Sequence, residues 1–360
     1  MIPNHTAPFC ATVVGQDEAE EAARILNKYC KLAGRVTPEM LDAKTYDLTS
    51  GEWAHAVDEW KTLEMHALRQ YARICPKARD AYFQLILFPV QFMGNLYYMY
   101  YSQAMNNALY KKGDAAMNIW ADRCEKAFKR DGELMRQYNK DIAGGKWDGM
   151  MIQKHIGYTS WNDSFRADML PKLYRAENIK NIFEDEANKG YVSIEAEHYS
   201  SKTDGKGAQW TVIPDMGRTL SAVTLLPQTG DIQDASLTYS FVSNKPAGKV
   251  KVHIVTKSTL DYLNKGGMTY SLKLDGSDPV TVNFNSDMNE APENIYDKYY
   301  PTIARRVIEK VVEMPMSATS DSVHTLTFIP NDPAIVLEKI VIDFGGYTKQ
   351  YLFGKESLRR

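Results

Sequence analysis

The sequence predicts a multidomain chain of the class α then β, with a helical bundle followed by an antiparallel β-sandwich. Three observations support this prediction. Apolar residues recur at helical spacing up to about residue 140, and they alternate with polar residues from about residue 190. Nine of the 15 prolines follow residue 180, where breaks between short strands are expected. The length of 360 residues suits roughly two domains, each with its own core.

The first half of the chain contains four amphipathic patterns, which predict an up-and-down bundle of about four helices. Thr49 and Glu52 have the spacing of a capping box, so a helix is expected to begin there. Pro89 lies inside the third pattern and is expected to kink its helix. The apolar stripes cover residues 19–29, 53–71, 83–108 and 116–138.

The segment from Ala81 to Tyr110 has no charged residue and is long enough to be considered as a membrane span. Its amide side chains argue against that interpretation, because amides are costly in hydrocarbon but can be satisfied inside a protein core. We therefore expect a buried helix. The amides are Gln84, Gln91, Asn95, Gln103, Asn106 and Asn107.

Beyond the helices, the periodicity fails between Gly144 and Pro171, in an irregular stretch dense in aromatic residues. Such stretches are often functional. A charged linker is expected at 178–189. Alternating strands then follow without helices between them, which favours a sandwich over a parallel sheet. The clearest alternations are at 192–196, 250–254, 270–274 and 336–343.

Composition restricts the class of partner and the compartment only weakly. The net charge of −2 and a pI of about 6.4 lack the positive field that nucleic acids require, so no nucleic-acid partner is expected. The four cysteines, at 10, 30, 75 and 124, have no metal-binding spacing and define no disulfide.

The N-terminal residues show no export signal.

The strongest candidate site is a cluster between residues 146 and 161 that combines aromatic faces with charged and amide donors. Aromatic faces pack on pyranose rings and Lys or His can bind a carboxylate, so this composition is that of a sugar-acid subsite. The alternative is a loop clamped onto a neighbouring domain, with the histidine as a hydrogen-bonded structural residue. The candidate residues are Lys146, Trp147, Gln153, His155, Tyr158 and Trp161.

A second candidate site is the pair Glu195 and Glu197. Alternation along a strand would place both carboxylates on the same side of the sheet. Hard cations prefer oxygen ligands, so the pair could hold calcium. The alternative is a solvated strand face.

Seven short segments, in order along nearly the whole chain, give a further signal. They are Gly34–Glu39 (GRVTPE), Asp80–Val90 (DAYFQLILFPV), Gly145–Met151 (GKWDGMM), His155–Trp161 (HIGYTSW), Val192–Glu197 (VSIEAE), Trp210–Arg218 (WTVIPDMGR) and Asp332–Lys339 (DPAIVLEK). Together they resemble glycoside hydrolase family 115, which comprises xylan α-1,2-glucuronidases.

The resemblance implies a larger protein, in which an N-terminal domain and a (β/α)₈ barrel precede a helical bundle and a galactose-binding-like jelly-roll sandwich. The chain is similar to the last two parts, so we expect a C-terminal fragment. Residues 1–16 would be a remnant of the preceding barrel segment, 17–180 the bundle and 190–355 the sandwich. The loop 145–161 would face the barrel. The similarity of Ile194–Glu197 to the opening strand of carbohydrate-binding modules strengthens the calcium prediction.

The resemblance also implies that the acid and base of an inverting mechanism lie in the barrel, so no catalytic residue is assigned and the chain alone is expected to be inactive. The first hypothesis is a non-catalytic C-terminal half of a xylan α-1,2-glucuronidase. It would meet glucuronoxylan or aldouronic acids through the parent enzyme and form homodimer contacts, with no membrane and no cofactor besides structural calcium. The parent would be exported, to the periplasm or outside the cell.

Two alternatives stay open at this point. The chain could be a stand-alone module that binds xylan or uronates. It could also be a complete enzyme with an unrecognised carboxylate pair, because such a pair is defined by its distance in space and leaves no local motif.

Overall fold

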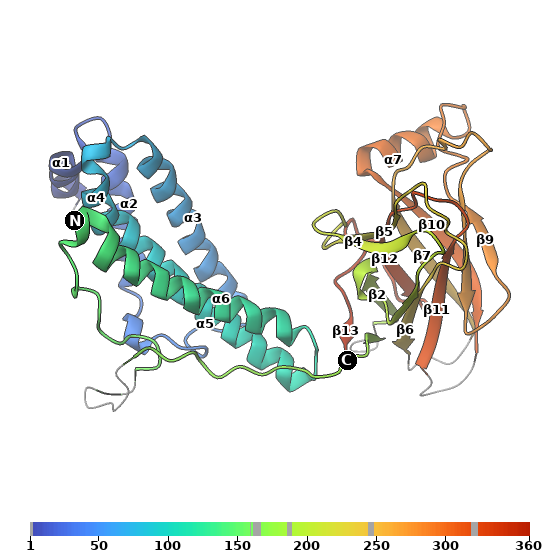
Figure 1. Ribbon diagram of the computed structural model, residues 1–360, viewed down its shortest axis with the longest axis horizontal. Coiled ribbons are helices and arrows are strands. Elements are labelled where there is room, and N and C mark those ends of the chain that lie inside the picture. The colour runs from blue at the N-terminus through green and yellow to red at the C-terminus, as the bar shows by residue number, and fades with distance from the viewer. Residues whose placement is uncertain (1–2, 159, 161–166, 186–188, 244–247, 318–322) are drawn as a thin grey trace. The chain divides into compact units, whose positions relative to one another are not determined.

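The computed structural model describes residues 3–158, 160, 167–185, 189–243, 248–317 and 323–360 (Figure 1). The chain forms two compact units, a helical unit at Met1–Glu177 and a β unit at Asn178–Arg360. The predicted order, helices first and sheets second, is confirmed.

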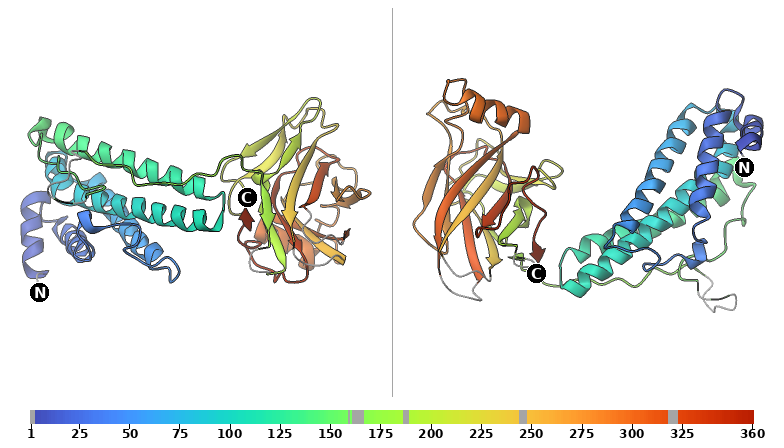
Figure 2. Two further views of the ribbon diagram at one scale, coloured as in Figure 1. Left: turned by 90° about the horizontal axis from the view of Figure 1, so that it is seen from below. Right: turned by 180° about the vertical axis from the view of Figure 1, so that it is seen from behind.

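The helical unit is an antiparallel arrangement in which α5 and α6 lie side by side along their length (Figures 1 and 2). Its core is rich in aromatic rings. The Tyr97 ring centroid lies 5.4 Å from that of Trp60 and 6.1 Å from that of Trp53, and all three side chains are buried. The helices are α1 Pro3–Val14, α2 Ala19–Ala33, α3 Glu52–Arg73, α4 Arg79–Tyr82, α5 Phe88–Lys112 and α6 Met117–Arg136.

The N-terminal helix α1 belongs to this unit. Cys10 and Val14 are buried in the same apolar cluster as Ala22 and Ile25 of α2. The segment that sequence reasoning separated as residues 1–16 is therefore packed, over its described part, as an element of the helical unit. The unit ends at Glu177, slightly before the predicted end at residue 180.

Helix α3 begins at Glu52, as predicted, but the predicted partner Thr49 is wrong. Glu52 Oε2 accepts the backbone N–H of Asp47 at 2.9 Å, and the Asp47 carboxylate accepts the Ser50 N–H at 2.6 Å and the Thr49 hydroxyl at 2.8 Å. Gly51, at a φ of 81°, turns the chain before the helix, so the Thr49 hydroxyl points back to Asp47. Hydrogen bonds from Ser50 and Thr49 lower the pKa of Asp47 to about 2.

The charge-free segment forms a buried helix, as predicted. Pro89 lies in the first turn of α5, where its missing N–H is not needed, and the interruption takes the form of a π-helical turn at Phe83–Leu87. The amides of Asn95 and Asn106 donate to backbone carbonyls of α6 at 2.9 and 2.8 Å. None of the described helices has the length and apolar character needed to cross a bilayer.

The chain after α6 is irregular, as predicted, and its described residues between 146 and 181 form no helix or strand. It runs back along the bundle (Figure 1). Asn106 exchanges two hydrogen bonds with the backbone of Tyr174, and Asn118 does the same with Ala176, at 2.8–3.0 Å. Amides on α5 and α6 thus fix the end of the segment to the helices.

The β unit is a sandwich of two open sheets (Figure 2). One sheet has the order β13-β1-β6-β11-β8-β9, with β3 also paired to β6, and the other has the order β10-β7-β12-β5-β4, with β2 paired to β12. Neighbouring strands are antiparallel except β1 and β6, which are parallel. The strands are β1 Ile182–Glu184, β2 Tyr191–Glu195, β3 Ser201–Thr203, β4 Gln209–Ile213, β5 Ala222–Leu226, β6 Ser236–Val242, β7 Gly248–Lys257, β8 Thr269–Leu274, β9 Val280–Asn283, β10 Val307–Met316, β11 Val323–Pro330, β12 Leu337–Asp343 and β13 Leu358–Arg359.

The four strands that alternation predicted correspond to β2, β7, β8 and β12. Inward residues of β2 and β12, such as Ile194 and Ile340, share one core with Tyr239 and Phe328 of the other sheet. One described helix, α7 Tyr300–Arg305, follows a π-helical turn at Ile295–Tyr299.

The expected linker at 178–189 contains a strand. β1 pairs with β6 and with β13, the strand at Leu358–Arg359. A strand of three residues is too short to show alternation, and its partners are far away in the sequence. The sheets therefore extend on both sides of the predicted range 190–355.

Candidate functional site

The candidate loop between α6 and residue 158 is anchored by Asn139, in the π-helical turn Gln137–Asp141 that follows α6. The Asn139 side chain accepts the backbone N–H of Met151 at 2.9 Å and donates to its carbonyl at 2.8 Å. Trp147 and Met151 pack half-buried against the bundle core. The loop is therefore a fixed part of the helical unit.

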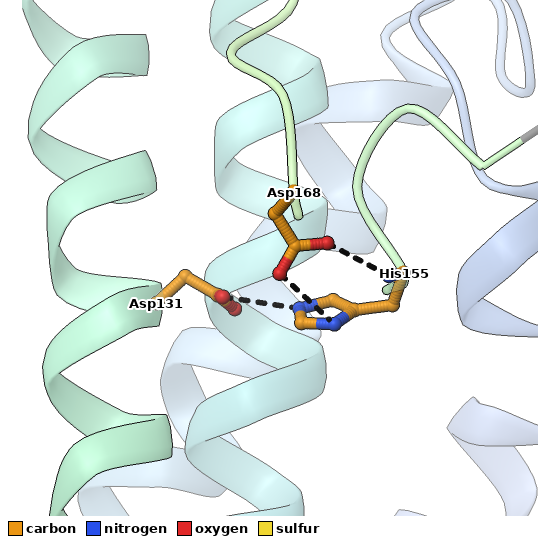
Figure 3. A group of neighbouring side chains, drawn as sticks. All are labelled: Asp131, His155 and Asp168. Atoms are coloured by element: carbon orange, nitrogen blue, oxygen red, sulfur yellow. Dashed lines mark hydrogen bonds and ion pairs between the residues drawn. The ribbon is translucent and has the colours of Figure 1, made fainter. Parts of the chain in front are cut away.

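A buried ionic cluster forms a second anchor, a few residues further along the loop (Figure 3). His155 Nε2 lies 3.0 Å from Oδ2 of Asp131 on α6. Its Nδ1 lies 3.1 Å from the Gln153 carbonyl and 3.4 Å from Oδ2 of Asp168. The other oxygen of Asp168 accepts the backbone N–H groups of His155 and Ile156 at 2.8 and 2.7 Å. We call Asp131, His155 and Asp168 the histidine clamp.

Among the described residues, every polar neighbour of the His155 ring is an acceptor, so both ring nitrogens are satisfied only when both carry a proton. Burial opposes this charge, but the hydrogen bond and charge of Asp131, the Gln153 carbonyl and the charge of Asp168 outweigh it and raise the pKa of His155. The clamp therefore favours an imidazolium between two carboxylates.

The donor atoms of the clamp lie within 4.8 Å of one another, which is close enough to consider a metal ion. However, the two nitrogens of the ring face different partners (Figure 3). One ion could bind only one of them, and His155 would have to lose the proton on that nitrogen. The arrangement therefore suits a charge clamp that holds the loop better than a metal centre.

The other predicted sugar-subsite residues lie along the same loop. Lys146 Nζ lies 4.9 Å from the centre of the Trp147 ring. The Gln153 side chain is exposed and Tyr158 is half-buried, while Trp161 lies outside the described residues. In the structure, the Lys146 ammonium therefore lies beside the Trp147 ring. His155 is buried and is held by hydrogen bonds within the helical unit. That these residues bind a sugar acid stays a prediction.

Sequence reasoning missed Asp131 and Asp168. Asp168 has no local signal. Asp131 has such a signal, because it lies between Ala127 and Leu134 in the apolar stripe of α6. The structure shows that its side chain is buried. A carboxylate in such a stripe predicts a buried cationic partner.

The predicted strand alternation at Glu195 and Glu197 is wrong. β2 ends at Glu195, and Ala196–His198 form a 3₁₀ turn, so the two carboxylates do not share a strand face. Glu195 is 2% exposed and Glu197 is half-buried.

Glu195 forms a buried ion pair with a lysine of this chain. Lys339 on β12 is fully buried, and its Nζ donates to Glu195 Oε1 at 2.7 Å, to the Thr219 hydroxyl at 3.1 Å and to the Gly354 carbonyl at 2.8 Å. Its three N–H donors are thus all used. Calcium at Glu195 and Glu197 stays a prediction, and an ion at Glu195 would share that carboxylate with Lys339.

Residues 186–356 match the family model described as the glycosyl hydrolase family 115 C-terminal domain. No curated protein matches the chain.

Similar solved structures include a family 115 4-O-methyl-α-glucuronidase with specificity for decorated arabinogalactans. It has 15% identity and a TM-score of 0.36, over 97% of this chain and 42% of that one. The chain therefore spans less than half the length of that enzyme. A family 35 carbohydrate-binding module from Clostridium thermocellum has 16% identity and a TM-score of 0.30, over 42% of this chain and 97% of that module. The C-terminal family 6 carbohydrate-binding module of LamC from Zobellia galactanivorans has 14% identity and a TM-score of 0.27, over 42% of this chain and 98% of that module.

Most of the β unit is thus similar to a C-terminal domain of glycosyl hydrolases. The match at residues 186–356 agrees with the resemblance to glycoside hydrolase family 115.

Proposed function

We propose that the chain is the non-catalytic C-terminal part of a family 115 α-glucuronidase, which removes glucuronic or 4-O-methylglucuronic acid side chains from xylan. The observation that carries this proposal is the match of residues 186–356 to the C-terminal domain of that family. In this proposal the two units support the catalytic barrel of the enzyme, which supplies the acid and base.

The helical unit would contribute to the substrate cleft through its anchored loop. Asn139 and the histidine clamp hold the loop on both sides of Gln153. The chain between Asn139 and Met151 carries Lys146 and Trp147, a cation beside an aromatic ring, and Trp147 packs against the bundle core. Such a pair can pack against a pyranose ring and bind its carboxylate.

The proposal predicts that the purified chain releases no glucuronic acid from aldouronic acids, glucuronoxylan or a glucuronidated arabinogalactan. The arabinogalactan is included because the solved family 115 enzyme is specific for decorated arabinogalactans. Released sugar acid is measured by chromatography against a complete family 115 enzyme as positive control. Turnover by the purified chain that co-purifies with it through two different columns would contradict the non-catalytic assignment.

A further inference from the structure

A small cavity in the β unit combines an aromatic wall with two cations. Its volume is about 190 Å³, and it lies between the end of α7 and the segment that follows β12. No carboxylate is among its described lining residues, although acidic residues are common elsewhere on this unit. The lining residues are Arg305, Lys349, Gln350, Tyr351 and Phe353.

Arg218 fixes the two walls of this cavity. Its Nη1 donates to the Arg305 carbonyl at 2.8 Å and its Nε to the Tyr351 carbonyl at 3.4 Å. Its guanidinium carbon lies 4.5 Å from the centre of the Tyr351 ring, so it covers that ring on one side. Tyr351 nevertheless remains 64% exposed, so much of its ring stays available to a ligand. Phe353 is buried and forms an apolar floor.

The two cations differ in how far they are neutralised. Lys349 Nζ lies 2.6 Å from Glu309 Oε2, outside the cavity lining. The Arg305 guanidinium has no ionic partner among the described residues, although its backbone carbonyl accepts from Arg218. An uncompensated guanidinium beside an exposed aromatic ring favours a ligand with a carboxylate, which arginine can bind with two parallel hydrogen bonds.

A neighbouring cavity of about 240 Å³ shares Arg305, Lys349 and Phe353. It is also lined by three acids, Asp287, Asp297 and Glu309, and by two further lysines, Lys298 and Lys310. Asp287 lies within ion-pair distance of both lysines and Glu309 pairs with Lys349, so the cations of this cavity are largely neutralised. The charge distribution therefore favours the smaller cavity for the carboxylate, and the larger one for neutral parts of the same molecule.

We propose that Arg305, Lys349, Gln350 and Tyr351 form a binding site for a sugar acid, with the pyranose ring against Tyr351 and the carboxylate on Arg305. The Gln350 amide can bond to ring hydroxyls. The preference for a sugar acid over other carboxylates rests on the proposed function. The site itself belongs to the β unit and is separate from the loop of the helical unit.

The test is a titration of the full chain with sodium D-glucuronate, followed by backbone amide NMR shifts. D-glucose and sodium acetate serve as matched probes that lack the carboxylate and the sugar ring. Glucuronate should shift the amides of Gln350 to Phe353 in a saturable manner, and the other two probes should bind at least about tenfold more weakly. Arg305→Met and Tyr351→Ala should each weaken glucuronate binding by about tenfold.

Arg306→Met is the matched control, because it removes the same charge one residue further along and outside the cavity lining. Equal affinity for acetate would overturn the sugar-acid site in favour of a simple anion site. Absence of shifts with glucuronate, or equal losses in the Arg306 variant, would overturn it as well. These outcomes leave the hydrolysis assay unaffected, so failure of this site and failure of the proposed function can be distinguished.

Discussion

Replacing Lys339 with methionine should lower the free energy of unfolding of the β unit by about 3–5 kcal/mol. Methionine keeps most of the volume of the lysine stem but removes its ammonium group. Glu195, which is 2% exposed, then loses its cationic partner, and its side chain keeps the hydroxyl of Thr219 as its one hydrogen-bond donor in the described part of the chain. An unpaired carboxylate in an apolar interior is among the most destabilising single changes in a folded protein.

The loss of stability can be measured by amide hydrogen exchange in β2 and β12, because Glu195 and Lys339 are paired residues of these two strands. The double variant Glu195→Gln with Lys339→Met should recover at least half of the loss, since a neutral amide can stay buried beside Thr219. Lys249→Met, at an exposed ion pair with Glu313, is the control and should leave exchange in these strands unchanged. A single Lys339 variant as stable as the wild type would show that the Lys339 and Glu195 pair is not needed for stability.

The second large effect is expected at the histidine clamp. His155→Leu should lower the free energy of unfolding of the helical unit by about 3–5 kcal/mol, because it leaves Asp131 buried without a cation. The hydrogen bonds that the backbone N–H groups of residues 155 and 156 donate to the Asp168 carboxylate remain, so the loop should keep its path in the folded state.

The clamp also predicts a pH dependence with a defined sign. The pKa of His155 is raised in the folded protein above its ordinary value of about 6.5. The folded state therefore binds this proton more tightly than the unfolded state does. The stabilisation is fully present below about pH 6.5 and is lost as the pH rises through the folded pKa.

Urea unfolding of the helical unit between pH 6 and 9, followed by hydrogen exchange in α6, measures both effects. The wild type should lose stability as the pH rises over this range, and the His155→Leu variant should lose that part of the slope. His66→Leu makes the same substitution at an exposed histidine and is the control. Equal slopes in the wild type and the His155 variant would rule out the imidazolium clamp.

The fold class could be predicted from the sequence because its main signals are periodic and local. Stripes of apolar residues marked α2, α3, α5 and α6, and alternation marked β2, β7, β8 and β12. The errors arose where structure depends on distant partners. β1 is defined by its pairing with β6 and β13, and the cap of α3 depends on Asp47, which precedes the expected capping residue.

The candidate site was predictable in composition but not in geometry. His155 bonds to Asp131 across 24 residues, and Glu195 bonds to Lys339 across 144 residues. No spacing rule connects such pairs. The 3₁₀ turn after Glu195 is also invisible to an alternation rule, because Ala196 and Glu197 continue the strand pattern in sequence while the backbone leaves the strand.

The central claim is that the chain works as part of a family 115 α-glucuronidase. Its most direct test is to fractionate an extract of cells that produce the chain, assaying each fraction for α-glucuronidase activity on aldouronic acids and for peptides of both units by mass spectrometry. We predict that the peptides and the activity elute together through successive columns. Elution of the peptides in fractions free of α-glucuronidase activity would contradict the claim and would favour a stand-alone binding module.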